Sequence, residues 1–267
     1  MGKVISVTNQ KGGVGKTTTS VNLAASLVAT KRSVLLIDLD AQGNATMGSG
    51  VNKHELEMSV YDVLVDQTPI EEVLQATDPG YDLVGSNADL TAAEVQMLDL
   101  EDREQRMKLA LARIKHNYDF VLIDCPPSLN MLTINALVAS DSVIIPMQCE
   151  YYALEGLTAL LNTIERIKSG LNPNLEIDGL LRTMYDPRIA LSNQVSSQLT
   201  DHFGDKVYRT IIPRNVRLAE APSHGLPVLE YDRRSRGAVS YLALAGELIR
   251  RAEQKVPTAA AAETSPA

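Results

Sequence analysis

Residues 11–18 of this sequence, Lys-Gly-Gly-Val-Gly-Lys-Thr-Thr, form the segment best suited to bind phosphate. Glycine lets the backbone turn sharply and approach a polyphosphate, and the N–H groups and dipole at the start of a helix attract its negative charge. Lys16 is expected to reach the β- and γ-phosphates of a nucleotide, and the Thr17 hydroxyl to bind a magnesium ion. The segment therefore predicts a phosphate-binding loop.

This loop departs from the usual pattern G-x-x-x-x-G-K-[ST], whose first glycine would stand where the chain has Gln10. Lys11 and the pair Gly12 and Gly13 take its place. The alternative interpretation is a glycine-rich turn that carries two lysines by chance. The flanking patterns disfavour it, because an apolar run at 4–7 precedes the loop and a helical pattern follows it.

Carboxylates follow two further apolar runs. The run at 33–38 ends in Asp38 and is followed by Asp40, and the run at 120–124 ends in Asp124. In an open parallel sheet, ligands bind at the edge formed by the carboxyl ends of the strands. Asp124 therefore fits a carboxylate that holds magnesium through water or the Thr17 hydroxyl. The alternative is a surface aspartate that caps the next element.

These residues must be positioned by alternating strands and helices. Apolar, β-branched runs predict strands, and the spacing of apolar residues predicts helices. The order strand, helix, strand around the loop is a βαβ unit, which favours an α/β fold: a mostly parallel twisted sheet flanked by helices on both faces. Strands are predicted at 4–7, 33–38, 81–85, 120–124, 142–147, 176–184 and 207–212. Helices are predicted at 17–29, 60–65, 70–76, 91–98, 101–117, 154–169, 191–203 and 236–251, the fourth with a capping box formed by Thr91 and Glu94.

Length and composition set the domain organisation and the compartment. A chain of 267 residues suits one large domain, which we place at 1–255, with a disordered tail at 256–267 that lacks large apolar residues. There is no signal segment and no apolar run of about 18 residues, so we expect a cytoplasmic protein without a membrane partner. Cys125 and Cys149 lack the C-x-x-C spacing of a zinc site and are expected to be buried free thiols.

The formal net charge of −8 argues against a protein that coats itself with nucleic acid, because phosphate contacts require lysine and arginine. One segment of the chain is nevertheless locally basic. Residues 206–236 contain seven basic and three acidic side chains. Any nucleic-acid surface is therefore expected there.

Four further segments complete a recognisable set: VLLIDLDAQGNAT at 34–46, DCPP at 124–127, QCEYYALEG at 148–156 and IPRNVR at 212–217. With the loop, they resemble the ParA/Soj chromosome-partitioning ATPases of the ParA/MinD group, which carry a deviant P-loop (Walker A motif) of the form K-G-G-x-G-K-[ST]. The similarity extends over residues 3–251. It implies the P-loop NTPase fold.

The resemblance also implies a set of roles. ATP-bound monomers would pair face to face, with Lys11 reaching the phosphates held by the partner, and Asp40 would position or activate the attacking water. Thr17, Asp38 and Asp124 would organise Mg²⁺. The expected ATP contacts are Lys11, Gly12, Gly13, Val14, Gly15, Lys16, Thr17 and Thr18 in the loop, and Pro213, Arg214 and Asn215 at the adenine.

For partners, the resemblance implies a weak ATPase whose ATP-bound homodimer binds double-stranded DNA without sequence preference and associates with the nucleoid. A ParB-type centromere-binding protein would stimulate hydrolysis. Arg188 and Arg217 match DNA-binding arginines of the family. The alternative is that these arginines form ordinary surface ion pairs.

Three other functions remain as alternatives. A MinD-like membrane-cycling ATPase needs a C-terminal amphipathic helix with bulky apolar residues, which the end of this chain lacks. An iron–sulfur ATPase would use Cys125 and Cys149 as ligands. A nucleotide-gated scaffold would bind ATP and hardly hydrolyse it. One departure from the family bears on this last option: Ala41 stands where relatives often carry Pro, which is expected to loosen the loop holding Asp40.

Overall fold

The computed structural model describes residues 2–151 and 153–254, and within them one sheet has the strand order β3-β4-β2-β5-β1-β6-β7. Its neighbouring strands are parallel except for β3 and β4, which are antiparallel. The strands are β1 (Lys3–Val7), β2 (Val34–Asp38), β3 (Leu74–Ala76), β4 (Asp82–Val84), β5 (Phe120–Asp124), β6 (Ser142–Gln148) and β7 (Glu176–Thr183). The predicted α/β class with a mostly parallel sheet is confirmed.

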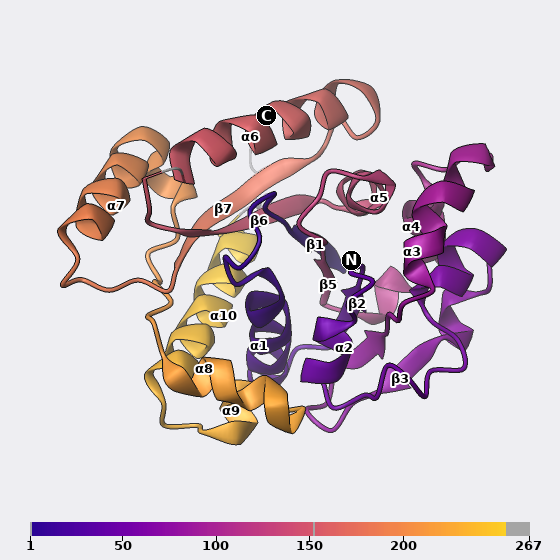
Figure 1. Ribbon diagram of the computed structural model, residues 1–267, viewed down its shortest axis with the longest axis horizontal. Coiled ribbons are helices and arrows are strands. Elements are labelled where there is room, and N and C mark those ends of the chain that lie inside the picture. The colour runs from indigo at the N-terminus through magenta and orange to yellow at the C-terminus, as the bar shows by residue number, and fades with distance from the viewer. Residues whose placement is uncertain (1, 152, 255–267) are drawn as a thin grey trace, which may run out of the picture.

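Helices cover both faces of this sheet, and Figure 1 shows α1 beside α10 on one face and α3 and α4 together at one end. The α-helices are α1 (Lys16–Ala29), α2 (Asn44–Gly48), α3 (Leu90–Gln96), α4 (Arg106–Ile114), α5 (Met131–Ala139), α6 (Ala153–Gly170), α7 (Ala190–Phe203), α8 (Val216–Glu220), α9 (Val228–Tyr231) and α10 (Arg236–Gln254). A π-helical turn, η1 (Asp62–Asp66), and five 3₁₀ turns complete the described elements: η2 (Ile70–Glu72), η3 (Met97–Asp99), η4 (Lys115–Asn117), η5 (Gly204–Lys206) and η6 (Ala221–His224).

The central strands read as continuous apolar runs because both of their faces are buried. Every residue of β2 and β5 is buried. Successive side chains of a strand point to opposite faces, so Leu36 and Leu122 pack with α1 and α10, whereas Ile37 and Ile123 pack with α3, α4 and α5. The last residues of the two strands, Asp38 and Asp124, are paired at the carboxyl edge.

Three predicted elements differ from the structure. Residues 70–76 form the turn η2 followed by the edge strand β3, because Leu74–Ala76 pairs with β4 and this pairing overrides the weak helical pattern. Residues 207–212 are extended but form only an isolated bridge to β7, at Leu180 and Val207. The helix predicted at 101–117 begins at Arg106 and ends at Ile114.

The predicted capping box is also wrong, and four helices were not predicted: the short helices α2, α8 and α9 and the longer helix α5. Helix α3 begins at Leu90, with no side-chain cap, and Glu94 instead accepts a hydrogen bond from Asn130. Helix α5 follows Asn130, whose side chain accepts a hydrogen bond from the Thr133 N–H as an N-cap. The sequence of α5 is apolar nearly all round, so it lacks the amphipathic period that reveals a surface helix.

Two further predictions concern the C-terminal tail and the absence of a membrane-spanning helix. The tail predicted to be disordered, 256–267, lies outside the described residues. Within the described residues, no helix is both long enough and apolar enough to cross a bilayer.

Packing around β7 generates a stability prediction. A Cβ atom added to Gly179 would lie 2.6 Å from the Tyr208 ring, which is buried, bonded through its hydroxyl to Asp178 at 2.7 Å and covered by Arg251. Because this ring cannot move aside, we expect Gly179→Ala to lower the free energy of unfolding by about 1–3 kcal/mol.

Chemical denaturation measures this change, with Gly170→Ala as the matched control. A Cβ atom at Gly170 meets nothing within 4 Å, so this control is expected to stay within about 0.5 kcal/mol of the wild type. Equal stability of the two variants would contradict the packing argument.

Candidate functional site

The loop between β1 and α1 takes a backbone shape that requires glycine. Gly13 and Gly15 have φ values of 71° and 86°, which side chains rarely allow, and Gly15 is the N-cap of α1. A Cβ atom at Gly12 or Gly13 would meet nothing within 4 Å, so the space above the loop is open. The first N–H groups of α1 therefore face an open site that suits an anion.

The ends of β6 and β7 support the underside of the loop. The Thr183 hydroxyl donates to the Val14 carbonyl at 2.7 Å, and the Gln148 amide donates to the Gly13 carbonyl at 3.3 Å. Val14 is buried, whereas Gly12 and Gly13 are exposed. The loop is thus fixed from below before any ligand binds.

Two buried carboxylates lie next to the loop. Asp38 and Asp124 are 0 % exposed and lie at paired positions of β2 and β5. Asp124 accepts hydrogen bonds from the Thr17 hydroxyl at 2.7 Å and the Ser20 hydroxyl at 2.9 Å. Asp38 accepts both the N–H and the hydroxyl of Thr46 at 2.8 Å. The structure therefore brings three predicted residues, Thr17, Asp38 and Asp124, together.

Burial dominates the electrostatics of this pair. It raises the pKa of Asp38 and of Asp124, and the neighbouring charge of Asp38 raises the pKa of Asp124 further. Burial lowers the pKa of Lys16, and the Asp124 carboxylate opposes that shift. Two adjacent buried carboxylates favour any ligand that brings positive charge to them.

The oxygens of this site suit magnesium. Mg²⁺ prefers oxygen ligands, and it is usually held by one or two carboxylates together with water and substrate phosphates. Thr17 and Asp124 already share a hydrogen bond at the edge of the loop, beside the buried Asp38. Within the described residues, no group of three His, Cys, Asp or Glu side chains could hold a metal by itself. The donor set therefore fits a magnesium ion that arrives with a polyphosphate.

The two lysines of the loop have different environments. Lys16 is buried and its Nζ donates to the Lys11 carbonyl at 3.2 Å, so it lies along the inside of the loop. Lys11 Nζ lies 2.6 Å from Glu150 Oε2, and both side chains are about half exposed. Lys11 is thus on the open side of the loop, where it can contact another molecule only after leaving Glu150.

Asp40 lies in the short loop between β2 and α2. Its N–H donates to Asp38 Oδ1 at 3.1 Å, and its own Oδ1 accepts the Gln42 N–H at 3.0 Å. The Gly43 N–H donates to the Asp40 carbonyl at 2.8 Å, which closes a turn around Ala41. These bonds fix the loop through backbone groups and do not involve the side chain at position 41.

The predicted adenine segment, from Pro213 to Asn215, pairs with the residues that follow β7. Thr183 and Met184 lie 3.8 Å from the Cβ position of Gly15, and the next residue, Tyr185, forms a bridge to Pro213. The Arg214 N–H donates to the Tyr185 carbonyl at 3.2 Å. Asn215 is the N-cap of α8, and its side-chain oxygen is buried without a hydrogen-bond partner among the described residues.

The two predicted DNA-binding arginines are exposed and paired within the chain. Arg188 forms an ion pair with Asp186 at 2.7 Å, and Arg217 pairs with Glu220 at 2.8 Å and with Asp232 at 3.3 Å. Their side chains are 87 % and 50 % exposed. Exposed pairs of this kind contribute little stability, so a phosphate group can compete for either arginine.

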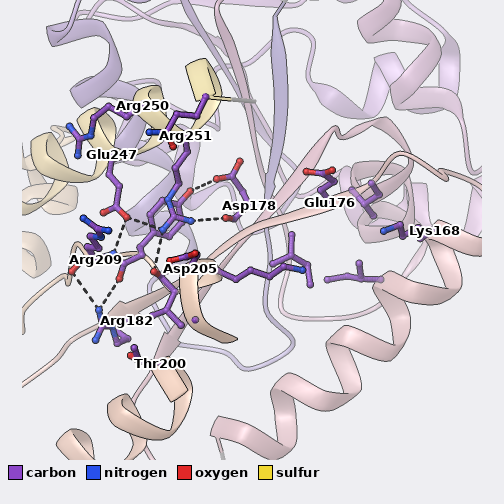
Figure 2. Close-up of a pocket in the computed structure, with 18 of the residues that line it drawn as sticks. Lys168, Glu176, Asp178, Arg182, Thr200, Asp205, Arg209, Glu247, Arg250 and Arg251 are labelled. Atoms are coloured by element: carbon purple, nitrogen blue, oxygen red, sulfur yellow. Dashed lines mark hydrogen bonds and ion pairs between the residues drawn. The ribbon is translucent and has the colours of Figure 1, made fainter. Parts of the chain in front are cut away.

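A cavity of about 890 Å³ lies along β7 and is lined by none of the predicted site residues. Figure 2 shows hydrogen bonds and ion pairs that join several of its lining residues, among them Glu247 and Arg251. The Glu247 carboxylate accepts from the N–H groups of Arg209 and Thr210 and from Arg251, and the Arg251 guanidinium lies 4.2 Å from the centre of the Tyr208 ring. The Glu247 carboxylate is thus compensated by Arg251 and by two backbone N–H groups.

Sequence reasoning missed several residues of the site. Ser20 could have been found, because it lies three residues after Thr17 and hence on the same face of α1. The contacts of Thr46 with Asp38 and of Glu150 with Lys11 depend on the fold and carry no sequence signal. Cys125 and Cys149 are buried free thiols, as predicted.

The chain is similar to known proteins, one of which has been solved with a bound nucleotide and magnesium. Residues 2–177 match a family model described as an AAA domain. A crystal structure of cobyrinic acid a,c-diamide synthase from Mycobacterium smegmatis, with bound ADP and magnesium, is 38% identical. The two structures superpose with a TM-score of 0.84, and the match covers 95% of this chain and 96% of the synthase chain.

Two relatives carry the names Soj and ParA. The chain is 55% identical to the sporulation initiation inhibitor protein Soj of Bacillus subtilis, over 93% of this chain and 98% of that protein. It is 49% identical to the chromosome partitioning protein ParA of Caulobacter vibrioides, over 97% of this chain and 98% of that protein. The chain therefore belongs to the ParA/Soj family of chromosome-partitioning ATPases.

Proposed function

We propose that this ATPase, a single domain over residues 1–255, partitions chromosomal or plasmid DNA. Two ATP-bound copies pair face to face, and the dimer binds double-stranded DNA of any sequence. Hydrolysis, weak in the protein alone and stimulated by a ParB-type centromere-binding protein, then releases it. The observation that carries this proposal is the convergence of Lys16, Thr17, Asp38 and Asp124 below the loop, with Lys11 on its open side.

The residues of the chain divide the work of phosphoryl transfer, which requires positioning and charge neutralisation. The glycine-rich loop and Lys16 bind the triphosphate, and Thr17, Asp38 and Asp124 hold magnesium, which neutralises charge on the β- and γ-phosphates when bound. Asp40 orients the attacking water. Lys11 leaves Glu150 and neutralises charge on the nucleotide of the partner copy.

The adenine end of the nucleotide is assigned to the segment from Pro213 to Asn215. The unpartnered amide oxygen of Asn215 is an acceptor without a donor, and the exocyclic amine of adenine is a donor. A buried acceptor left unpaired is costly, so a ligand that supplies the missing donor gains affinity there. This observation supports ATP over nucleotides that lack such an amine.

DNA binding is assigned to the exposed arginines. Each copy offers Arg188 and Arg217, and a dimer doubles the number of phosphate contacts. Two linked patches bind a polyanion far more tightly than one patch does. Nucleotide-dependent pairing can therefore control DNA affinity, and it would keep the ATP-bound protein on the nucleoid of the cytoplasm.

If nucleotide-dependent pairing controls DNA affinity, the purified protein should retain DNA in the presence of ATP and release it with ADP or without nucleotide. Retention on immobilised duplex DNA of unrelated sequences measures this at a fixed salt concentration. Equal retention in all three nucleotide states would contradict the proposal.

The assigned roles predict different effects at Asp40 and Lys16. We expect Asp40→Ala to bind ATP and DNA but to lose about 10²-fold or more in kcat, because the attacking water is no longer positioned. Lys16→Ala removes a charged donor to the phosphates and should weaken ATP binding at least about tenfold. ATPase assays together with binding of a fluorescent ATP analogue separate the two, and normal turnover by the Asp40 variant would refute its role.

Charge reversal at Arg217 should weaken binding to all DNA sequences alike. We expect Arg217→Glu to make the slope of log affinity against log salt shallower by about 0.9 for each phosphate that the variant no longer neutralises. Arg113→Glu is the matched control, since Arg113 is also exposed and paired, with Glu71 at 3.1 Å, but lies on α4. The same salt slope for both variants would make Arg217 an ordinary surface residue.

A further inference from the structure

The loop that carries Asp40 is held from the side by a residue that no motif contains. Ser86 is fully buried and lies two residues after the end of β4. Its hydroxyl donates a hydrogen bond to the Asp40 carbonyl at 2.8 Å. Because β4 pairs with β2 in the sheet, this bond fixes the loop relative to the sheet itself.

Ser86 also forms a hydrogen bond with helix α2, which follows the loop. The Ser86 N–H donates to the Thr46 hydroxyl at 2.9 Å, and that hydroxyl donates in turn to Asp38 at 2.8 Å. Ser86 therefore links the backbone of Asp40 to the carboxylate of Asp38 through buried bonds. Side chains buried in this way have little freedom to take another position.

The backbone of Gly43 also packs closely against Ser86. Gly43 has a φ value of 59°, and a Cβ atom there would lie 2.6 Å from the Ser86 carbonyl oxygen. The Gly43 N–H donates to the Asp40 carbonyl, which thus accepts two hydrogen bonds, one from within the loop and one from Ser86. A carbonyl has two lone pairs, so the Asp40 carbonyl is fully bonded.

The Asp40 carboxylate is held less firmly than its backbone. It accepts one hydrogen bond, from the Gln42 N–H, and is partly exposed. Its side chain can therefore turn toward a ligand while its peptide group stays in place. That combination suits a residue that must hold a water molecule at a defined point.

We propose that Ser86 is a positioning residue for ATP hydrolysis, acting through the backbone of Asp40. The inference rests on the proposed function, in which Asp40 orients the attacking water. Small displacements of a positioning group slow phosphoryl transfer strongly, because the rate depends on near-attack geometry.

The test is Ser86→Ala, with Ser49→Ala as the matched control. Ser49, the C-cap of α2, is also buried; its hydroxyl donates to the Ala45 carbonyl at 2.7 Å and accepts from the Tyr81 hydroxyl at 2.7 Å, both outside the Asp40 loop. We expect Ser86→Ala to lower kcat about tenfold, the effect of one lost hydrogen bond, and to leave KM and the affinity for a fluorescent ATP analogue within about twofold. Ser49→Ala should leave kcat within about twofold of the wild type.

A second readout needs no nucleotide. The Gly43 amide closes the turn on the Asp40 carbonyl, so in Ser86→Ala its hydrogen exchange should be about tenfold faster, whereas Ser49→Ala should leave it unchanged. The inference is overturned if the two variants have the same kcat and the same Gly43 exchange. It is also overturned if Ser86→Ala loses ATP binding together with kcat, since its role would then be structural.

These outcomes separate the inference from the proposed function. If Asp40→Ala kept normal turnover, the water-positioning role would fail, although Gly43 exchange would still respond to Ser86→Ala. If Asp40→Ala lost turnover and Ser86→Ala did not, the inference alone would fail.

Discussion

The burial of two carboxylates side by side is the constraint on which the rest of this structure depends. Asp38 and Asp124 end two neighbouring strands of the sheet and have no exposed surface. Buried like charges are costly unless hydrogen bonds and opposite charge compensate them. The hydroxyls of Thr17, Ser20 and Thr46 supply the hydrogen bonds, whereas the positive charge comes in part from Lys16. A site arranged in this way is completed by a cation that arrives with a polyphosphate.

Residues assigned to the nucleotide and residues assigned to other macromolecules are held differently. Lys16, Asp38 and Asp124 are buried and fixed by hydrogen bonds, so they are organised before ligand binds. Lys11, Arg188 and Arg217 instead form exposed ion pairs with acidic residues of their own chain. Such pairs are weak and can be exchanged for phosphate at little cost. The chain thus combines fixed residues below the loop with exposed ion pairs that, under the proposed function, would transfer to a partner copy or to DNA.

The sequence predicted the positions of the loop and the strand ends better than it predicted the peripheral elements. Loop and strand-end residues could be located because a parallel sheet brings the carboxyl ends of its strands to one edge, whatever the connections between them. Residues 70–76 and the helix at Met131–Ala139 could not, because one depends on pairing with β4 and the other lacks an amphipathic period. The contacts of Ser86 and Glu150 join segments far apart in the chain, so only the folded structure reveals them.

A crystal structure with magnesium and a non-hydrolysable ATP analogue tests the central claim most directly. The account predicts the triphosphate on the loop from Lys11 to Thr18, magnesium at Thr17 beside Asp38 and Asp124, and Lys11 released from Glu150 toward the nucleotide of a second copy. A nucleotide bound elsewhere, or bound at the loop without a metal at Thr17, would contradict it.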